Sequence, residues 1–109
     1  MIKSYKPSRS FTKVSNKLLD GFIEHIGPMA GIVYIYYARL VNQKIDRAFP
    51  ALQTTAKKCG MSKSSVVRCN KILTKVGLIV IEKGGGKAHN RYIVRRPSMT
   101  MLERYIEEK

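Results

Sequence analysis

Apolar residues in the first half of the chain recur at helical spacing on both sides of Gly27-Pro28. Ser15 or Asn16 can cap the first of these helices. The apolar face of this helix is expected to hold Leu18, Leu19, Phe22, Ile23 and Ile26. After Pro28, which suits a first helical turn, residues Met29 to Val41 are apolar almost all round. This second helix is therefore expected to be buried centrally or shared with another subunit.

The tyrosines of this second helix admit two interpretations. Tyr34, Tyr36 and Tyr37 could stack on nucleic-acid bases, but on so apolar a helix they are expected to belong to the core. The flanking segments carry weaker patterns. Phe11 to Val14 could form a short strand, and residues 42–50 are expected to be a polar connection.

A short helix, a tight turn and a longer helix are predicted next. The short helix begins at Thr54 or Thr55 and runs to Cys59, and Gly60 supplies the permissive backbone of the turn. Ser62 can cap the longer helix, which spans Lys63 to Val76 and stops at Gly77. The inner stripe of the longer helix consists of Val66, Cys69, Leu73 and Val76. The opposite face, which is basic and carries a hydroxyl group, consists of Lys63, Ser64, Val67, Arg68 and Lys71.

Beyond Gly77 the pattern changes to that of two strands and a final helix. Residues 78–83 (LIVIEK) predict a strand, residues 84–88 (GGGKA) a flexible turn, and residues 89–96 (HNRYIVRR) a returning strand. An amphipathic helix is then expected from Ser98 to Lys109, with Thr100 and Glu103 as a capping box. The inward side chains of this last helix are expected to be Leu102, Tyr105 and Ile106.

The charge of the chain is strongly positive and unevenly distributed. There are 21 Lys and Arg residues against 7 Asp and Glu residues, which gives a net charge of +14. Residues 51–97 hold eleven of the bases and a single acid, Glu82, so they carry +10. Self-repulsion of this size destabilises a compact fold unless a polyanion offsets it. Nucleic acid, an anionic membrane surface and an acidic protein are therefore the candidate partners.

The length of 109 residues predicts one domain with short extensions. Residues 1–10 are expected to be a flexible basic arm, residues 11–97 the domain, and residues 98–109 its C-terminal helix. The longest apolar stretch, around Ile32 to Tyr37, is too short to cross a bilayer, and the first residues lack the apolar core of a signal peptide. A cytoplasmic protein without a membrane segment is expected.

The candidate catalytic and metal-binding residues do not form a recognisable site. Gly84-Gly85-Gly86-Lys87 lacks the Ser or Thr that ends a phosphate loop and lies between two strands, which favours a turn. His25 and His89 are isolated in the sequence. Cys59 and Cys69 match neither a zinc pattern nor a disulfide framework and are expected to be small core residues, with a redox switch as the minor alternative. We therefore expect no enzymatic activity, no cofactor and no metal.

Residues 55–79 (TAKKCGMSKSSVVRCNKILTKVGLI) resemble the helix-turn-helix core of bacterial winged-helix regulators. Ala56 stands where the small residue packs beneath the second helix, and Gly60 is the turn glycine. Val66 and Leu73 match the buried anchors, and Gly77 leads into the wing. The resemblance implies a winged helix-turn-helix fold, mainly α with a small β-hairpin wing, and it implies DNA binding.

The upstream residues resemble the N-terminal domains of phage and plasmid replication initiators, of the replication protein O and DnaD-like types. This second resemblance is carried by Asn16-Lys17-Leu18-Leu19-Asp20, Val33-Tyr34, Arg39 and Pro50. Such initiators usually continue into a second domain. In addition, Asn70 occupies a position that is usually apolar, where the helix packing is altered or an interface exists. The resemblance implies replication initiation, while a transcriptional regulator or a plasmid-partition centromere-binding protein of the same fold is the alternative.

These patterns together predict an interface for double-stranded DNA on the longer helix and the wing. The expected DNA-binding residues are Lys63, Ser64, Ser65, Val67, Arg68, Lys71, Lys83, Lys87, His89 and Arg91. Arg68 is the best candidate for a bidentate contact to guanine. The expected partners are double-stranded DNA, a second copy of the chain in a homodimer, and replication or partition proteins, but no membrane. A basic module that binds proteins or membranes is the distant alternative.

Overall fold

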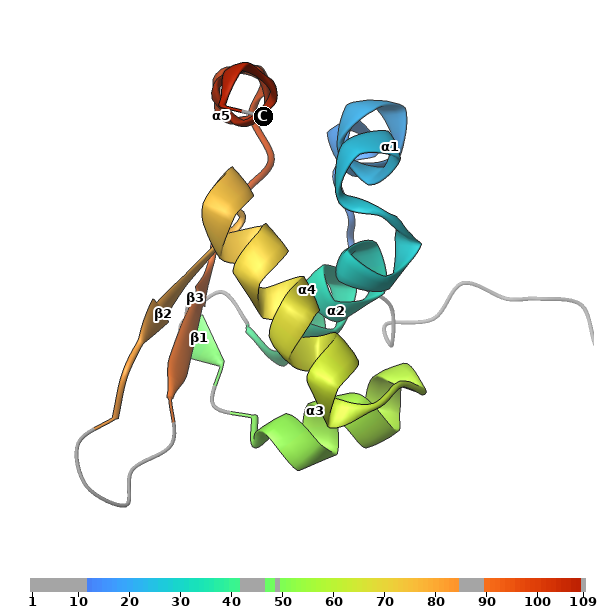
Figure 1. The fold of residues 1–109 in the computed structure, drawn as a ribbon, viewed down its shortest axis with the longest axis vertical. Coiled ribbons are helices and arrows are strands. Elements are labelled where there is room, and N and C mark those ends of the chain that lie inside the picture. Colours follow the sequence, from blue (N-terminus) through green and yellow to red (C-terminus); the bar gives the residue numbers. More distant parts are fainter. Residues whose placement is uncertain (1–11, 42–46, 49, 85–89, 109) are drawn as a thin grey trace, which may run out of the picture.

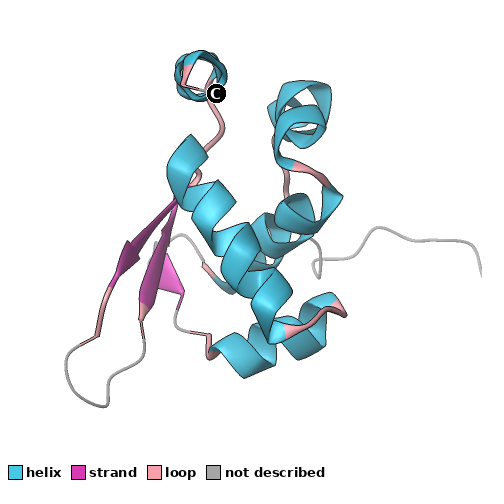
Figure 2. Ribbon diagram, viewed as in Figure 1, coloured by secondary structure: helices cyan, strands magenta, loops and turns pink. Residues whose placement is uncertain are grey.

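The structure, a computed structural model, describes residues 12–41, 47–48, 50–84 and 90–108 of the chain. Within these ranges, helices pack on one another and against a small antiparallel sheet (Figure 2). The fold is mainly helical and contains a β-hairpin, as the sequence predicts.

The first helical segment starts directly after Ser15. The Ser15 side-chain oxygen accepts a hydrogen bond from the Lys17 backbone N–H (3.2 Å), so Ser15 provides the predicted cap. The strand predicted over Phe11 to Val14 is wrong, because residues 12–14 pair with no described strand; Phe11 lies outside the described residues.

A wide helical turn changes which side chains of this segment reach the core. The π-helical turn η1 (Leu18–Phe22) continues as the helix α1 (Ile23–Ile26). Leu18, Phe22 and Ile26, spaced by four residues, are buried. Because a π-turn is wider than an α-turn, Leu19 falls off this line and is 71% exposed, so its predicted place on the apolar face is wrong.

The helix α2 (Pro28–Leu40) forms the centre of the molecule, as its apolar sequence predicts. Its side chains Val33, Tyr34 and Tyr37 are buried in the hydrophobic core, and Tyr36 is half-buried against it. The Tyr34 hydroxyl donates a hydrogen bond to the backbone carbonyl of Arg95 (2.7 Å). The tyrosines of α2 therefore pack in the core, which was the favoured of the two interpretations.

The helices α3 (Leu52–Cys59) and α4 (Lys63–Val76) are joined by the predicted tight turn. Gly60 adopts a left-handed backbone (φ 68°), which glycine tolerates without steric cost. Ser62 caps α4, because its side-chain oxygen accepts a hydrogen bond from the Ser65 N–H (3.1 Å). The start of α3 lies two residues before Thr54, and its capping position is occupied by Ala51. The predicted inner stripe of α4 is buried: Val66, Cys69, Leu73 and Val76.

The described part of the sheet has three strands in the order β1-β3-β2. The strands β2 (Ile79–Glu82) and β3 (Arg91–Val94) are antiparallel and pair Ile79 with Val94 and Glu82 with Arg91. They form the predicted hairpin, although both strands are shorter than expected. The two-residue strand β1 (Arg47–Ala48) pairs antiparallel with β3 within the segment predicted to be a polar connection, so that prediction missed a strand.

The helix α5 (Met99–Glu107) packs on its own chain through Leu102 and Tyr105, which are buried as predicted. Its cap is Ser98, whose side-chain oxygen accepts a hydrogen bond from the Met101 N–H (3.3 Å). The capping box predicted from Thr100 and Glu103 is therefore wrong, because Thr100 already lies inside the first turn. Ile106 is 41% exposed, so its predicted inward position is also wrong.

The elements are arranged so that the molecule has two different ends. Figure 1 shows α1 and α5 at one end of the longest axis, and α3 together with the described end of the β2–β3 hairpin at the other. The helix α4 runs obliquely between these ends, with α2 behind it in this view. None of the described helices combines the length and the apolar character that a membrane-spanning helix needs.

Candidate nucleic-acid interface

The face of α4 that points away from the core carries the predicted basic residues. Lys63, Ser64, Arg68 and Lys71 are exposed, and Val67 is 38% exposed among them. All five were predicted for the interface. The tight turn at Gly60 and the Ser62 cap hold the first turn of α4, so these side chains project from a well-defined helix start.

Ser65 does not belong to this exposed face, and its predicted contact with DNA stays a prediction. It is 8% exposed because it lies four residues before Cys69, on the buried side of the helix. Its hydroxyl oxygen accepts hydrogen bonds from the Ser62 hydroxyl (3.0 Å) and from the Arg68 guanidinium (3.2 Å). Ser65 thus orients Arg68 instead of reaching outward itself.

The hairpin contributes two of its four predicted residues to the described surface. Lys83 and Arg91 are exposed near the end of the β2–β3 ladder, where Glu82 pairs with Arg91 in the strand register. Beyond them the Gly84 N–H donates a hydrogen bond to the side-chain oxygen of Asn90 (3.4 Å). Lys87 and His89 lie outside the described residues.

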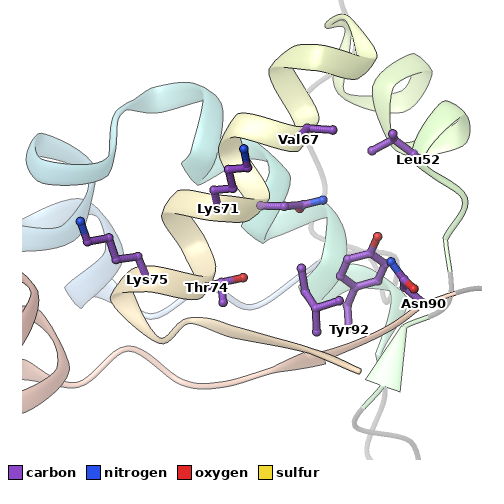
Figure 3. A pocket seen from close by; sticks show the side chains of 9 residues that line it. Leu52, Val67, Lys71, Thr74, Lys75, Asn90 and Tyr92 are labelled. Atoms are coloured by element: carbon purple, nitrogen blue, oxygen red, sulfur yellow. The ribbon is translucent and has the colours of Figure 1, made fainter. Parts of the chain in front are cut away.

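A groove of about 540 Å³ separates α4 from the hairpin, and we call it the α4–hairpin groove. It is lined by Leu52, Val67, Asn70, Lys71, Thr74, Lys75, Ile81, Asn90 and Tyr92. Figure 3 shows Val67 and Leu52 pointing toward one another at one end, with Tyr92 and Asn90 on the hairpin side. The lining is predominantly apolar, with the charges of Lys71 and Lys75 on the α4 side.

Beneath the groove, a buried polar contact ties α4 to α2 and to the sheet. Asn70 is 7% exposed, and its side-chain oxygen accepts a hydrogen bond from the Tyr37 hydroxyl (2.7 Å). The Tyr37 ring stacks on the Tyr92 ring of β3, with centroids 4.8 Å apart. Burial raises the pKa of Tyr37 well above its ordinary value, so the hydroxyl keeps its proton and acts as the donor to Asn70. The side-chain oxygen of the polar residue at this usually apolar position therefore has its hydrogen-bond partner within the core.

On the other flank of α4, Arg68 lines a second and smaller hollow. This hollow lies between α4 and the junction of α1 with α2, and its walls include Ile26, Met29 and Ile72. Arg68 and Lys71 therefore lie on the same outer face of α4 but border different hollows. Together they give α4 a basic outer face from one flank to the other.

The structure adds residues to this surface that sequence reasoning did not select. Thr74 and Lys75 continue the outer face of α4 into the groove, and Asn90 borders the groove from the hairpin. Lys75 follows Lys71 by four residues, so the helical period would have found it. Leu52 offered no such signal, because its place depends on how α3 packs against α4.

The cysteines lie in the core region and both are free thiols. Cys69 is buried and Cys59 is half-buried, as predicted for small core residues. Burial raises the pKa of both thiols, which keeps them protonated and weakly nucleophilic near neutral pH. Among the described residues, His, Cys, Asp and Glu side chains nowhere gather in a group of three that could hold a metal ion.

No family model, curated protein or solved structure matches the chain. The described residues form a capped helix with a basic outer face, a neighbouring hairpin with exposed basic side chains, and a largely apolar groove between the two.

Proposed function

We propose that the chain is a winged helix-turn-helix protein that binds double-stranded DNA in a sequence-specific manner. The observation that carries this proposal is the basic outer face of α4 beside a hairpin that exposes Lys83 and Arg91. In this proposal α4 enters the major groove, which is wide enough for an α-helix, and the hairpin acts as the wing on the phosphate backbone.

The charge distribution supports a polyanionic partner on this side of the molecule. Glu82 is the only acid among residues 51–97, which hold α3, α4 and the hairpin. Lys and Arg side chains that neutralise phosphates release bound counterions, which favours association with DNA. The proposed phosphate contacts are those of Lys63, Lys71, Lys83 and Arg91. Lys87 and His89 remain proposed contacts of the wing.

Arg68 is the proposed reader of a base. Its guanidinium has five N–H donors, and the hydrogen bond to Ser65 leaves the others for a bidentate contact to guanine. Ser64 and Val67 flank Arg68 on the exposed face and are proposed to contact base edges as well.

The biological role is proposed from the sequence resemblance to phage and plasmid replication initiators. A transcriptional regulator or a partition protein would use the same surface, and replication or partition proteins would then be its further partners. A module for membrane surfaces is less well supported, because such a helix carries aromatic or large apolar anchors opposite its basic face. The sequence of α4 contains no aromatic residue, and its apolar stripe is buried in the core.

Selection from a randomised duplex library tests the proposal. The wild-type chain should enrich a defined site, and Arg68→Ala should lose about 1–3 kcal/mol of binding free energy and relax the preference at one base position. Arg104→Ala, which removes an exposed Arg from α5, is the matched control and should select the wild-type site. Enrichment of no site by the wild-type chain would contradict sequence-specific binding.

A further inference from the structure

The side chain of Asn70 is buried against the core and also lines the α4–hairpin groove. Its oxygen is held by the Tyr37 hydroxyl, which stays protonated and therefore fixes the orientation of the amide. Within the described residues, every fully buried side-chain nitrogen or oxygen has a hydrogen-bond partner, and the Asn70 nitrogen has none. The nitrogen is therefore not fully buried, and the α4–hairpin groove is a hollow that Asn70 lines.

The groove combines this neutral donor with apolar walls and two positive charges. The walls are the side chains of Leu52, Ile81 and Tyr92, and the charges belong to Lys71 and Lys75. A ligand that suits this lining needs apolar surface for the walls, a hydrogen-bond acceptor for the amide, and negative charge for the lysines. A volume of about 540 Å³ is in the range of clefts that hold small-molecule-sized groups.

We propose that one sugar–phosphate strand of the bound DNA lies in the α4–hairpin groove, with the Asn70 amide donating a hydrogen bond to a phosphate oxygen. The carbon atoms of deoxyribose meet the apolar walls, and Lys71 and Lys75 neutralise the flanking phosphates. The inference rests on the proposed function and assigns Asn70, a residue that is 7% exposed, to the binding surface. The competing role for Asn70 is structural only, as the acceptor for Tyr37.

A double variant separates the two roles of Asn70. Asn70→Leu combined with Tyr37→Phe removes the amide donor and also the hydroxyl that would otherwise lose its acceptor. Because both partners become apolar, the thermal unfolding of the double variant should remain close to that of the wild type. Tyr37→Phe alone keeps the amide and is the matched control. Binding is measured by fluorescence anisotropy with a labelled duplex of random sequence over a range of salt concentrations.

The double variant should bind the duplex about tenfold more weakly than the wild type, the value of one hydrogen bond to a charged group, while Tyr37→Phe retains most of the affinity. For the double variant, the slope of log affinity against log salt should equal that of the wild type, because a neutral amide displaces no counterion. Lys71→Ala, in contrast, should flatten that slope by about 0.9. Wild-type affinity in the double variant, or an equal loss in Tyr37→Phe, would overturn the role of Asn70 alone. Failure of the wild-type chain to bind the duplex would instead overturn the proposed function.

Discussion

Gly60 and Gly77 end the helices α3 and α4 in the left-handed region, with φ angles of 68° and 97°. Their surroundings differ. A Cβ atom at Gly60 would meet nothing within 4 Å, whereas a Cβ atom at Gly77 would lie 3.2 Å from the Met101 side chain of α5. Both positions therefore favour glycine because of their left-handed backbone. At Gly77 the close packing of Met101 is a second reason for a residue without a side chain.

These two glycines give a matched pair of stability predictions. Gly60→Ala should lower the free energy of unfolding by about 1–2 kcal/mol, the cost of a left-handed backbone in an alanine. Gly77→Ala should cost more, because Met101 must also shift. Urea unfolding followed by circular dichroism measures both changes. Equal destabilisation of the two variants would contradict the packing argument at the junction of α4 and α5.

The burial of Ser65 and Asn70 shows where residue-level prediction from the sequence ends. The exposed positions of Lys63, Arg68 and Lys71 follow from the helical period alone, and the structure confirms them. Ser65 was misplaced because its hydroxyl is satisfied by Ser62 and Arg68 and therefore tolerates burial. The burial of Asn70 depends on Tyr37, a partner 33 residues away that no local pattern reveals.

At the scale of elements, a helix or strand could be predicted from the sequence where its apolar side chains recur with a regular period. The helices α2 and α4 and the hairpin β2–β3 have strong periodicity and were placed correctly to within a few residues. The strand β1 has two residues and is defined by its pairing with β3, so nothing in its own sequence indicates it. The π-turn η1 was likewise missed, because its bonding pattern departs from the regular α-helical period.

The hairpin itself carries an element-scale prediction about salt dependence. Lys83 and Arg91 are exposed near its described end, so as proposed phosphate contacts each should contribute about 0.9 to the slope of log affinity against log salt. Neutralising both to Ala should flatten the slope by about two units in all, and it should leave base preference nearly unchanged because phosphate contacts carry no direct sequence information.

The matched control for the hairpin removes the same charge from the other end of the molecule. Lys17 and Arg104 are exposed beside η1 and on α5. Figure 1 shows α1 and α5 at the end of the molecule opposite the described end of the hairpin. Lys17→Ala combined with Arg104→Ala should leave the salt slope close to that of the wild type, apart from long-range effects that salt screens. A wild-type slope in the Lys83 and Arg91 variant would place the hairpin away from the DNA backbone.

Over the whole molecule, charge is distributed unevenly along the sequence. Residues 51–97 carry +10, whereas residues 98–109 hold two bases and three acids and sum to −1. Such an asymmetry orients the molecule in the field of a polyanion before contact, with α4 and the hairpin foremost. In the proposed complex the end formed by α1 and α5 points away from the DNA, which leaves it open to protein partners.

The predicted homodimer must use apolar side chains that the chain does not bury itself. Most of the apolar surface of α2 packs within its own domain, as do Leu102 and Tyr105 of α5. The exposed apolar residues that remain on these two helices are Met29, Ile32, Met99 and Ile106. A substitution at Leu102 would therefore damage the fold, whereas Ile32 at 49% exposure and Ile106 at 41% exposure can be changed on the folded chain.

Sedimentation of the free protein tests the dimer and identifies the helix that forms it. The wild-type chain should sediment as two copies of 12.4 kDa at micromolar concentration. Ile32→Asp and Ile106→Asp, made separately, place a charge on α2 or on α5, and the variant at the interface should sediment as one copy because a carboxylate is costly to bury there. Thr100→Asp, an exposed polar position on α5, is the matched control and should leave the dimer intact.

The monomeric variant should lose affinity for DNA with two half-sites far more than for DNA with one, since only the dimer engages both. A wild-type chain that sediments at 12.4 kDa and binds DNA as a single copy would exclude the dimer.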